Sequence, residues 1–201
     1  MKRSLVFVFG FVCLTGAAVW AADEMPAAEK KPDAAQMEKM KTMMAPSDAH
    51  KVLEPLAGQW IYKSKFWMSP DGKVEESSGT SDNEMIYGGR FLKQITKGVW
   101  MGESFEGLGY TGYDNIKGEY ETVWVDSMAT GMMKIAGSYD AASKTLNQSG
   151  ANSCPMTGNK AMPLRSEWKI VDNDHNVYSS YMTGPDGKEA KGMEIEFTRV
   201  V

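Results

Sequence analysis

The fold of this chain is decided by the stretch Gly58–Phe66, GQWIYKSKF, in which apolar and polar side chains alternate. Because successive side chains of a β-strand point to opposite faces of the sheet, Trp60 and Tyr62 share one face and the two lysines take the other. The same alternation returns in the last residues of the chain and places Arg199 on the inward face. A side chain on the first strand and one on the last can meet only if the sheet curls and closes. We therefore expect Trp60 and Arg199 to stack, cation over indole, as a structural clasp at one end of a barrel.

Ten segments of strand length follow one another, and turn-forming residues separate them. No stretch between them has both the period and the length of a helix, so a parallel sheet with crossover helices is disfavoured. The sequence predicts an all-β fold, a single antiparallel up-and-down barrel of about ten strands with a short N-terminal helix. The expected strands are 59–68, 73–87, 90–97, 99–113, 119–127, 131–139, 145–152, 162–171, 176–183 and 189–200.

The barrel domain is expected to span residues 47–201 and to begin with a short helix. Ser47 can cap this helix over Asp48–Glu54, and Pro55 limits its length. The apolar side chains of the segment are expected to plug one end of the barrel: Val52, Leu53 and Leu56.

The first 21 residues have the pattern of a signal peptide. Lys2 and Arg3 precede an apolar run, and small residues follow near Ala21. The apolar run is too short, and too closely followed by acidic residues, for a membrane span. We therefore expect an exported bacterial protein, periplasmic or secreted, with no transmembrane anchor.

Residues 22–46 form an arm rich in Ala, Lys, Glu and Met, which we expect to be flexible. Met37, Met40 and Met44 would share one face of a helix there. Thioethers are soft ligands for Cu(I), but methionine is also an adaptable, helix-compatible residue, so we assign no metal to the arm.

Charge and cysteine content exclude some classes of partner and of stabilisation. The chain has 22 Lys and Arg against 26 Asp and Glu, a net charge of −4. Loss of Lys2 and Arg3 with the signal peptide leaves −6, which argues against nucleic acid as a partner. Cys154 is the single cysteine after residue 21, so the barrel depends on an apolar core and not on an internal disulfide.

Several short motifs are spread along the expected barrel domain. They are Leu56-Ala57-Gly58-Gln59-Trp60, Gly88-Gly89-Arg90-Phe91-Leu92, Phe105-Glu106-Gly107, Gly112-Tyr113-Asp114, Trp124-Val125-Asp126-Ser127 and Gly137-Ser138-Tyr139-Asp140. This series resembles a family of bacterial, often exported proteins known as domain of unknown function 1579, over about residues 50–200. The chain also has Gly-x-Trp after a short helix on its first expected strand and an arginine on its last. This combination resembles the calycin superfamily of lipocalins and fatty-acid-binding proteins. The resemblance implies a calycin-like barrel, with no established activity and no catalytic residues to carry over.

An inward stripe of aromatic side chains with few inward charges favours a small apolar or aromatic ligand in the barrel lumen. On the segment 119–127 both faces carry apolar residues, and the alternative in which Val123 and Val125 face inward stays open. The side chains expected to contact the ligand are Tyr62, Phe66, Tyr120, Trp124, Asp126, Trp168 and Tyr178.

Two other functions stay open. The first is a small-molecule isomerase or hydrolase that uses Asp126 as a base beside Tyr120. The second is a structural envelope protein that meets another protein through one barrel end. His50, His175 and Cys154 are too scattered for a zinc or haem site, and no cofactor is expected. The oligomeric state is left undetermined.

Overall fold

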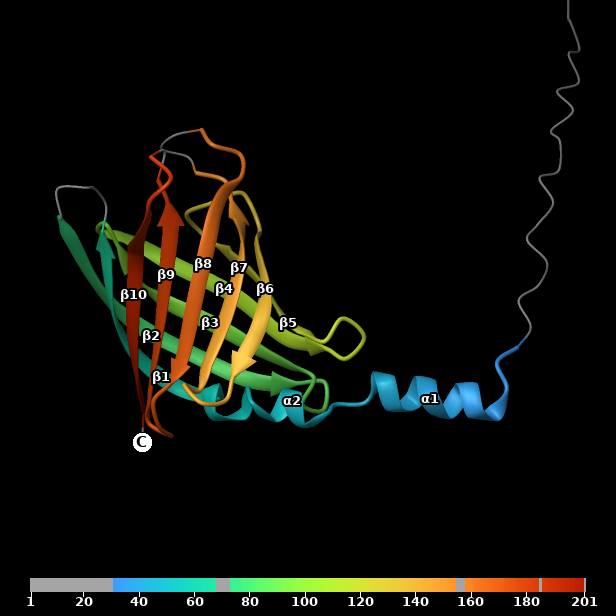
Figure 1. Cartoon of the computed structure of the whole chain (residues 1–201). Coiled ribbons are helices and arrows are strands. Elements are labelled where there is room, and N and C mark those ends of the chain that lie inside the picture. Colours follow the sequence, from blue (N-terminus) through green and yellow to red (C-terminus); the bar gives the residue numbers. More distant parts are fainter. Residues whose placement is uncertain (1–30, 68–72, 155–157, 185, 201) are drawn as a thin grey trace, which may run out of the picture.

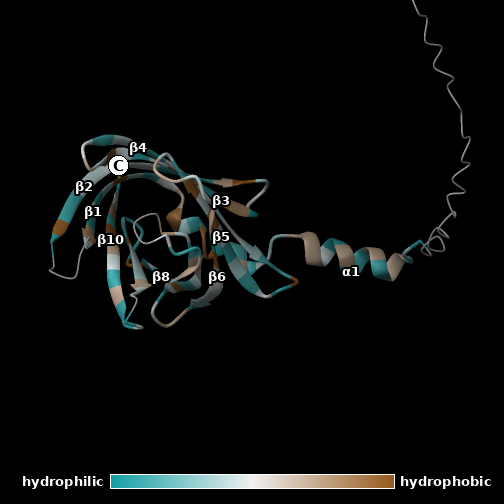
Figure 2. Cartoon of the chain, turned by 90° about the horizontal axis from the view of Figure 1, so that it is seen from above, coloured by the Kyte–Doolittle hydropathy of each residue, from teal (hydrophilic) through white to brown (hydrophobic). Residues whose placement is uncertain are grey.

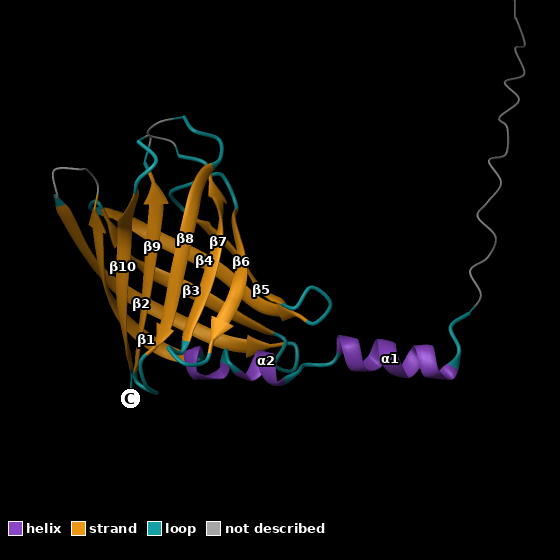
Figure 3. Ribbon diagram, in the orientation of Figure 1, coloured by secondary structure: helices purple, strands orange, loops and turns teal. Residues whose placement is uncertain are grey.

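Ten antiparallel strands form one closed barrel in the computed structural model, which describes residues 31–67, 73–154, 158–184 and 186–200. Each strand pairs with its neighbours in the chain, and β1 pairs with β10 to close the ring (Figure 1 and Figure 3). This order confirms the predicted fold class. The strands are β1 (Gly58–Trp67), β2 (Val74–Ile86), β3 (Phe91–Trp100), β4 (Glu103–Asp114), β5 (Glu119–Asp126), β6 (Met133–Asp140), β7 (Thr145–Asn152), β8 (Met162–Ile170), β9 (His175–Thr183) and β10 (Glu189–Arg199).

The turn between β3 and β4 lies later than the expected segments 90–97 and 99–113. The chain reverses at Met101 and Gly102, both of which have positive φ angles, 51° and 85°. Gly98 lies inside β3, and the hydroxyl of Tyr62 occupies the space that a side chain at this position would need. A Cβ built on Gly98 would lie 2.3 Å from that oxygen, so the glycine permits a close approach and does not mark a turn.

The segment 48–57 before β1 closes one end of the barrel as predicted, but as two short helices. We call it the floor segment, and the end that it closes the floor. The α-helix α2 (Asp48–Lys51) is followed by a 3₁₀-helix (Glu54–Leu56), because Pro55 fits the first turn of a helix and not its interior. Leu53 and Leu56 are fully buried, and Val52 packs beside them. The buried core at this end of the barrel, which we call the floor core, consists of Leu53, Leu56, Leu92, Tyr120, Leu146, Trp168 and Ile170.

The helix α1 (Ala34–Met44) projects to one side of the barrel, as the view from the opposite, open end shows (Figure 2). An aspartate–glutamine capping box begins it, and none of its residues is buried. Its last turn is held to the barrel through backbone oxygens. Asn115 donates to the carbonyls of Met43 and Ala45 at 2.9 and 2.8 Å, and Arg90 donates to that of Met44 at 3.0 Å. Residues 22–30 of the expected arm and the expected signal peptide, 1–21, lie outside the described residues.

The first and last strands meet through Trp60 and Arg199, which lie directly opposite each other. The guanidinium carbon of Arg199 lies 4.1 Å from the centroid of the Trp60 ring, and Trp60 is 1% exposed. The three nitrogens of the guanidinium donate to the carbonyls of Asn173, Ala57 and Pro55 at 2.6, 2.7 and 2.8 Å. One side chain therefore ties β10 to the floor segment and to the turn before β9.

Candidate ligand site in the barrel lumen

The register of the strands determines which side chains face the lumen. Residues directly opposite each other on paired strands share a face. Trp60 lies opposite Ser81, Ser81 opposite Thr96, Thr96 opposite Gly107, and Gly107 opposite Asp126. Because Trp60 points inward, this row carries the inward face across to β5 and settles the alternative that the sequence left open. The inward side chains of β5 are Tyr120, Thr122, Trp124 and Asp126, and Val123 and Val125 face outward.

Glycines let two inward aromatic rings lie flat against the barrel wall. A Cβ on Gly107 would lie 2.2 Å from the Trp124 ring, and one on Gly109 would lie 2.9 Å from it. The hydroxyl of Tyr62 lies in the same way over Gly79, 2.6 Å from the position of a Cβ there. The glycines therefore let these rings lie close against the strands that carry the glycines.

A belt of hydroxyl and amide side chains lines the lumen at mid-height, between the floor and the open end. We call it the polar belt. Most of its members are buried, and burial of a polar group is costly unless it is hydrogen-bonded. Its members are Ser64, Ser81, Gln94, Thr96, Thr111, Thr122, Gln148, Ser166 and Ser180.

Side chains of the polar belt bond to one another across neighbouring strands. The amide of Gln94 donates to the Ser81 hydroxyl at 3.2 Å. The hydroxyls of Thr111 and Thr122 lie 2.9 Å apart, and Thr122 also lies 2.9 Å from the Gln148 amide oxygen. Gln148 in turn donates to the carbonyl of Tyr120 at 3.1 Å. The belt is therefore a neutral network held in place by the strands that carry it.

The seven side chains expected at the ligand site divide into three groups. Tyr120 and Trp168 lie in the floor core, 4% and 6% exposed, and the Tyr120 hydroxyl donates to the carbonyl of Ala49 in α2 at 2.8 Å. Trp168 donates to the side-chain oxygen of Asn176 at 2.7 Å. These two side chains hold the floor in place and do not line the wall above it. Tyr62, 6% exposed, lies in a second buried cluster with Trp60 and Phe197, against which Tyr178 packs. Phe66, Trp124 and Asp126 lie nearer the open end.

Asp126 lies at the open end of β5, and its carboxylate is already engaged. One oxygen accepts from the Trp124 indole at 2.9 Å, and the other accepts from the backbone N–H groups of Met128 and Ala129 at 2.9 and 3.0 Å. Tyr120 is at the opposite end of the same strand, about 20 Å away at the usual rise per residue. The expected placement of Asp126 beside Tyr120 is therefore wrong, because one strand separates them along its length. The carboxylate caps a turn and orients an indole.

Inward side chains at mid-height retain accessible surface. Gln94, Thr122, Tyr178 and Ile195 face the lumen, yet each is only partly buried. Tyr178 lies deep enough that burial raises the pKa of its hydroxyl, which also bonds to Ser166. These side chains lie between the floor and the open end and are the inward ones there that water still reaches in part.

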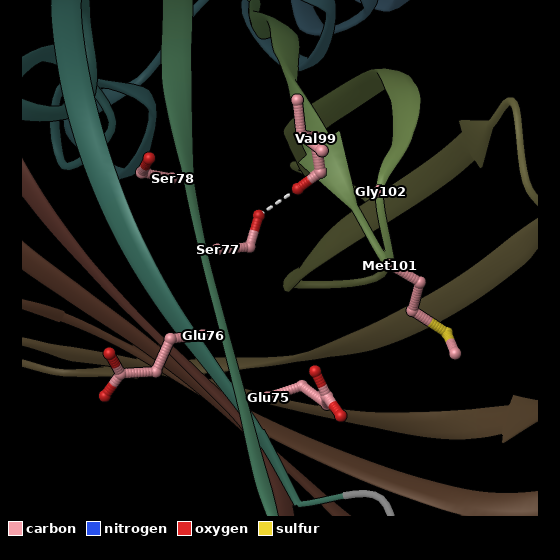
Figure 4. A pocket seen from close by; sticks show the side chains of 7 residues that line it. All are labelled: Glu75, Glu76, Ser77, Ser78, Val99, Met101 and Gly102. Atoms are coloured by element: carbon pink, nitrogen blue, oxygen red, sulfur yellow. Dashed lines mark hydrogen bonds between the residues drawn. The ribbon is translucent and has the colours of Figure 1, made fainter.

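The wall has a gap near the open end, between β2 and β3. Pairing of these strands begins at Gly79 and Gly98, so the first residues of β2 have no partner on β3. A pocket of about 510 Å³ fills the gap and is bordered by Val99, Met101 and Gly102 on the other side. In Figure 4, Glu75 and Ser77 lie on one side of β2 and Glu76 and Ser78 on the other. The Ser77 hydroxyl donates to the Val99 carbonyl across the gap. Because residues of both faces border the pocket, it is an opening in the wall beside the mouth.

The free energy of unfolding is expected to fall as the pH rises from about 10 to about 12. Burial raises the pKa of Tyr120 to about 12, with a smaller contribution from two neighbouring tyrosines, and burial also raises the pKa of Tyr62 and Tyr178. Above the ordinary tyrosine pKa of about 10, the unfolded chain releases these protons while the folded state retains them, so the unfolded state binds fewer protons and stability decreases. Urea unfolding across this range measures the slope. Tyr120→Phe should reduce the slope of the free energy of unfolding against pH, and Tyr87→Phe, at a residue 75% exposed, should not. Equal slopes for both variants would show that burial of Tyr120 does not cause the pH dependence.

The histidines and the cysteine lie away from the lumen. His50 is buried beside the floor, where its Nδ1 accepts from the Ser47 backbone N–H at 3.0 Å, and His175 begins β9 beside Asp172. Cys154 lies in the loop after β7. Within the described part of the chain, no three His, Cys, Asp or Glu side chains come together as metal ligands would. In the same ranges, no helix has the length and apolar character to cross a membrane.

Sequence reasoning named the aromatic residues of the lumen and missed most of the polar belt. Parity on β1 and β8 places Ser64 and Ser166 on the inward face between apolar or aromatic side chains, but gives them no role in the site. Ser81 and Thr96 lie on strands whose hydrophobic alternation is weak, so only pairing with β1 assigns their face.

Fold and lumen together define a small antiparallel barrel protein with an aromatic and neutral polar interior. The chain belongs to the DUF1579 family, described as a protein of unknown function, whose model matches residues 45–199. It is similar in fold to Rv2717c from M. tuberculosis, with a TM-score of 0.58 and 18% identity over 78% of this chain and 100% of that one. A redesigned β-barrel also matches, with a TM-score of 0.38 and 13% identity over 76% of this chain and 96% of that one. No curated protein matches the sequence.

Proposed function

We propose that this protein is an exported, calycin-like binding protein that holds a small, partly apolar ligand in its barrel lumen. The observation that carries the proposal is the accessible surface of inward side chains at mid-height, such as Gln94, Tyr178 and Ile195. The signal-peptide pattern of residues 1–21 supports export.

The composition of the interior favours binding over a purely structural role. A barrel interior that serves stability alone is best filled with apolar side chains at full packing density. Here serines, threonines and glycines face inward at mid-height, and two aromatic rings lie against the wall. The proposed enzyme loses its support, because the carboxylate of Asp126 caps a turn and is remote from Tyr120.

A neutral fluorescent probe, N-phenyl-naphthylamine, tests the proposal. Ile195→Trp places a large ring in the lumen and should weaken binding of the probe by roughly tenfold or more, because it occupies the space that the probe needs. Glu196→Trp adds the same ring on the outer face of the same strand and should leave binding unchanged. Absence of probe binding, or equal weakening by both variants, would contradict the proposal.

Two further measurements complete the test. Ile195→Phe makes a smaller addition and serves if the tryptophan variant does not fold. Native mass spectrometry of the protein recovered from its own host reports a bound ligand and, from the mass of the chain, whether residues 1–21 have been removed. A full-length chain without any bound molecule would count against both parts of the proposal.

A further inference from the structure

Charged side chains that face the lumen are confined to its two ends. In the ten described strands, the inward acidic residues are Glu75, Glu103 and Asp126, which lie opposite Phe66, Trp100 and Gly107 at the open end. The inward cation of these strands is Arg199, at the floor. The lysines of the same strands all face outward. The interior between the two ends therefore carries no formal charge.

The guanidinium of Arg199 is already engaged at the floor end, by three backbone carbonyls and by the carboxylate of Asp174, which lies 3.7 Å from its Nε. Each nitrogen of its guanidinium already donates to a backbone carbonyl, at 2.6 to 2.8 Å. Its plane is stacked on Trp60, and the carbonyls it binds belong to the floor segment and to the turn before β9. An acidic ligand group would have to break this arrangement to gain a cation.

The polar belt offers hydrogen bonds without charge. Gln94 and Thr122 are the members that keep accessible surface, and both belong to side-chain networks of hydroxyls and amides. Such groups can donate to a carbonyl or ether oxygen and accept from a hydroxyl. They cannot neutralise a carboxylate or a sulfonate.

We propose that the lumen takes uncharged amphiphilic ligands and rejects their anionic analogues. The inference rests on the proposed function and names the class of ligand. An anion in the lumen would lose its hydration without gaining a counter-ion, and on the way in it would meet the three carboxylates of the mouth. An uncharged ligand meets aromatic walls for its apolar part and the polar belt for one hydroxyl or carbonyl group.

Two probes that differ by one sulfonate group test this inference. N-phenyl-naphthylamine is neutral, and anilinonaphthalene sulfonate is its anionic analogue. The neutral probe should bind the full-length protein at least roughly tenfold more tightly than the sulfonate. Equal affinities, with both probes weakened by Ile195→Trp, would overturn the inference and leave the proposed function standing. If neither probe binds the unmodified full-length protein, the proposed function is overturned instead.

A charge introduced on the belt provides the reverse test. Ser180 is 6% exposed and faces inward between Ser166 and Met193. Ser180→Lys should strengthen binding of the sulfonate by roughly tenfold, and Ser180→Met, a neutral residue of similar length, should leave the ratio of the two affinities unchanged. If the lysine variant does not fold, salt gives the second measurement. Rising ionic strength screens the mouth carboxylates and should strengthen sulfonate binding alone, and a constant ratio would overturn the inference.

Discussion

Replacing Arg199 with alanine is expected to lower the free energy of unfolding by about 3–5 kcal/mol. The guanidinium makes three hydrogen bonds to backbone carbonyls at 2.6 to 2.8 Å and stacks on Trp60. Hydrogen bonds from a charged donor contribute about 1.5–3 kcal/mol each, and the truncation also leaves the carbonyls of Pro55 and Ala57 without this donor. Urea unfolding followed by tryptophan fluorescence measures the loss.

Arg165→Ala is the matched control for this effect. Arg165 lies on the outer face of β8, pairs with Glu167 and Glu189, and stacks on Tyr181, with its side chain 37% exposed. Ion pairs at such a surface contribute about 1 kcal/mol or less. If the two alanine variants lose the same stability, Arg199 is an ordinary surface residue and the clasp does not hold the barrel closed. Arg199→Lys should recover only part of the loss, because an ammonium cannot reach three carbonyls in one plane.

The fold could be predicted from sequence because turn residues and alternation repeat ten times with little conflict. The first strand shows this best, since Trp60, Tyr62 and Ser64 are buried and the lysines between them are exposed. The error at Gly98 has a physical reason. Glycine marks a turn in most sequence patterns, but here it makes room for the Tyr62 hydroxyl from two strands away. Contacts of that range are set by the register, which no single segment encodes.

The candidate site could be predicted only in part, for the same reason. Parity indicates that a side chain faces the lumen, but it does not give the height at which the side chain lies. Tyr120 and Trp168 face inward as predicted, and the floor segment then covers them. Trp124 also faces inward, at the other end of β5, where Gly107 and Gly109 give its ring a flat surface. Height along the barrel follows from the stagger of the strands and from the position of the floor.

Replacing Leu53 with alanine is expected to lower the free energy of unfolding by about 2–5 kcal/mol. Leu53 is 0% exposed and packs with Leu56 in a core to which β3, β5, β7 and β8 all contribute. Truncation removes apolar contacts and leaves a cavity where the floor segment packs on these strands. Because the core joins the segment to the barrel, unfolding should remain a single cooperative transition in urea.

Met37→Ala makes a comparable truncation on α1 and should change the free energy of unfolding by less than about 0.5 kcal/mol. Met37 is 42% exposed, and no residue of α1 is buried. The two variants therefore place the boundary of the cooperative unit between α1 and α2, close to residue 45, where the match to the family begins. A small loss for Leu53→Ala, or a separate early transition, would mean that the floor opens independently of the barrel. In that case the lumen would be open at both ends, and its depth could not be assigned from the floor core.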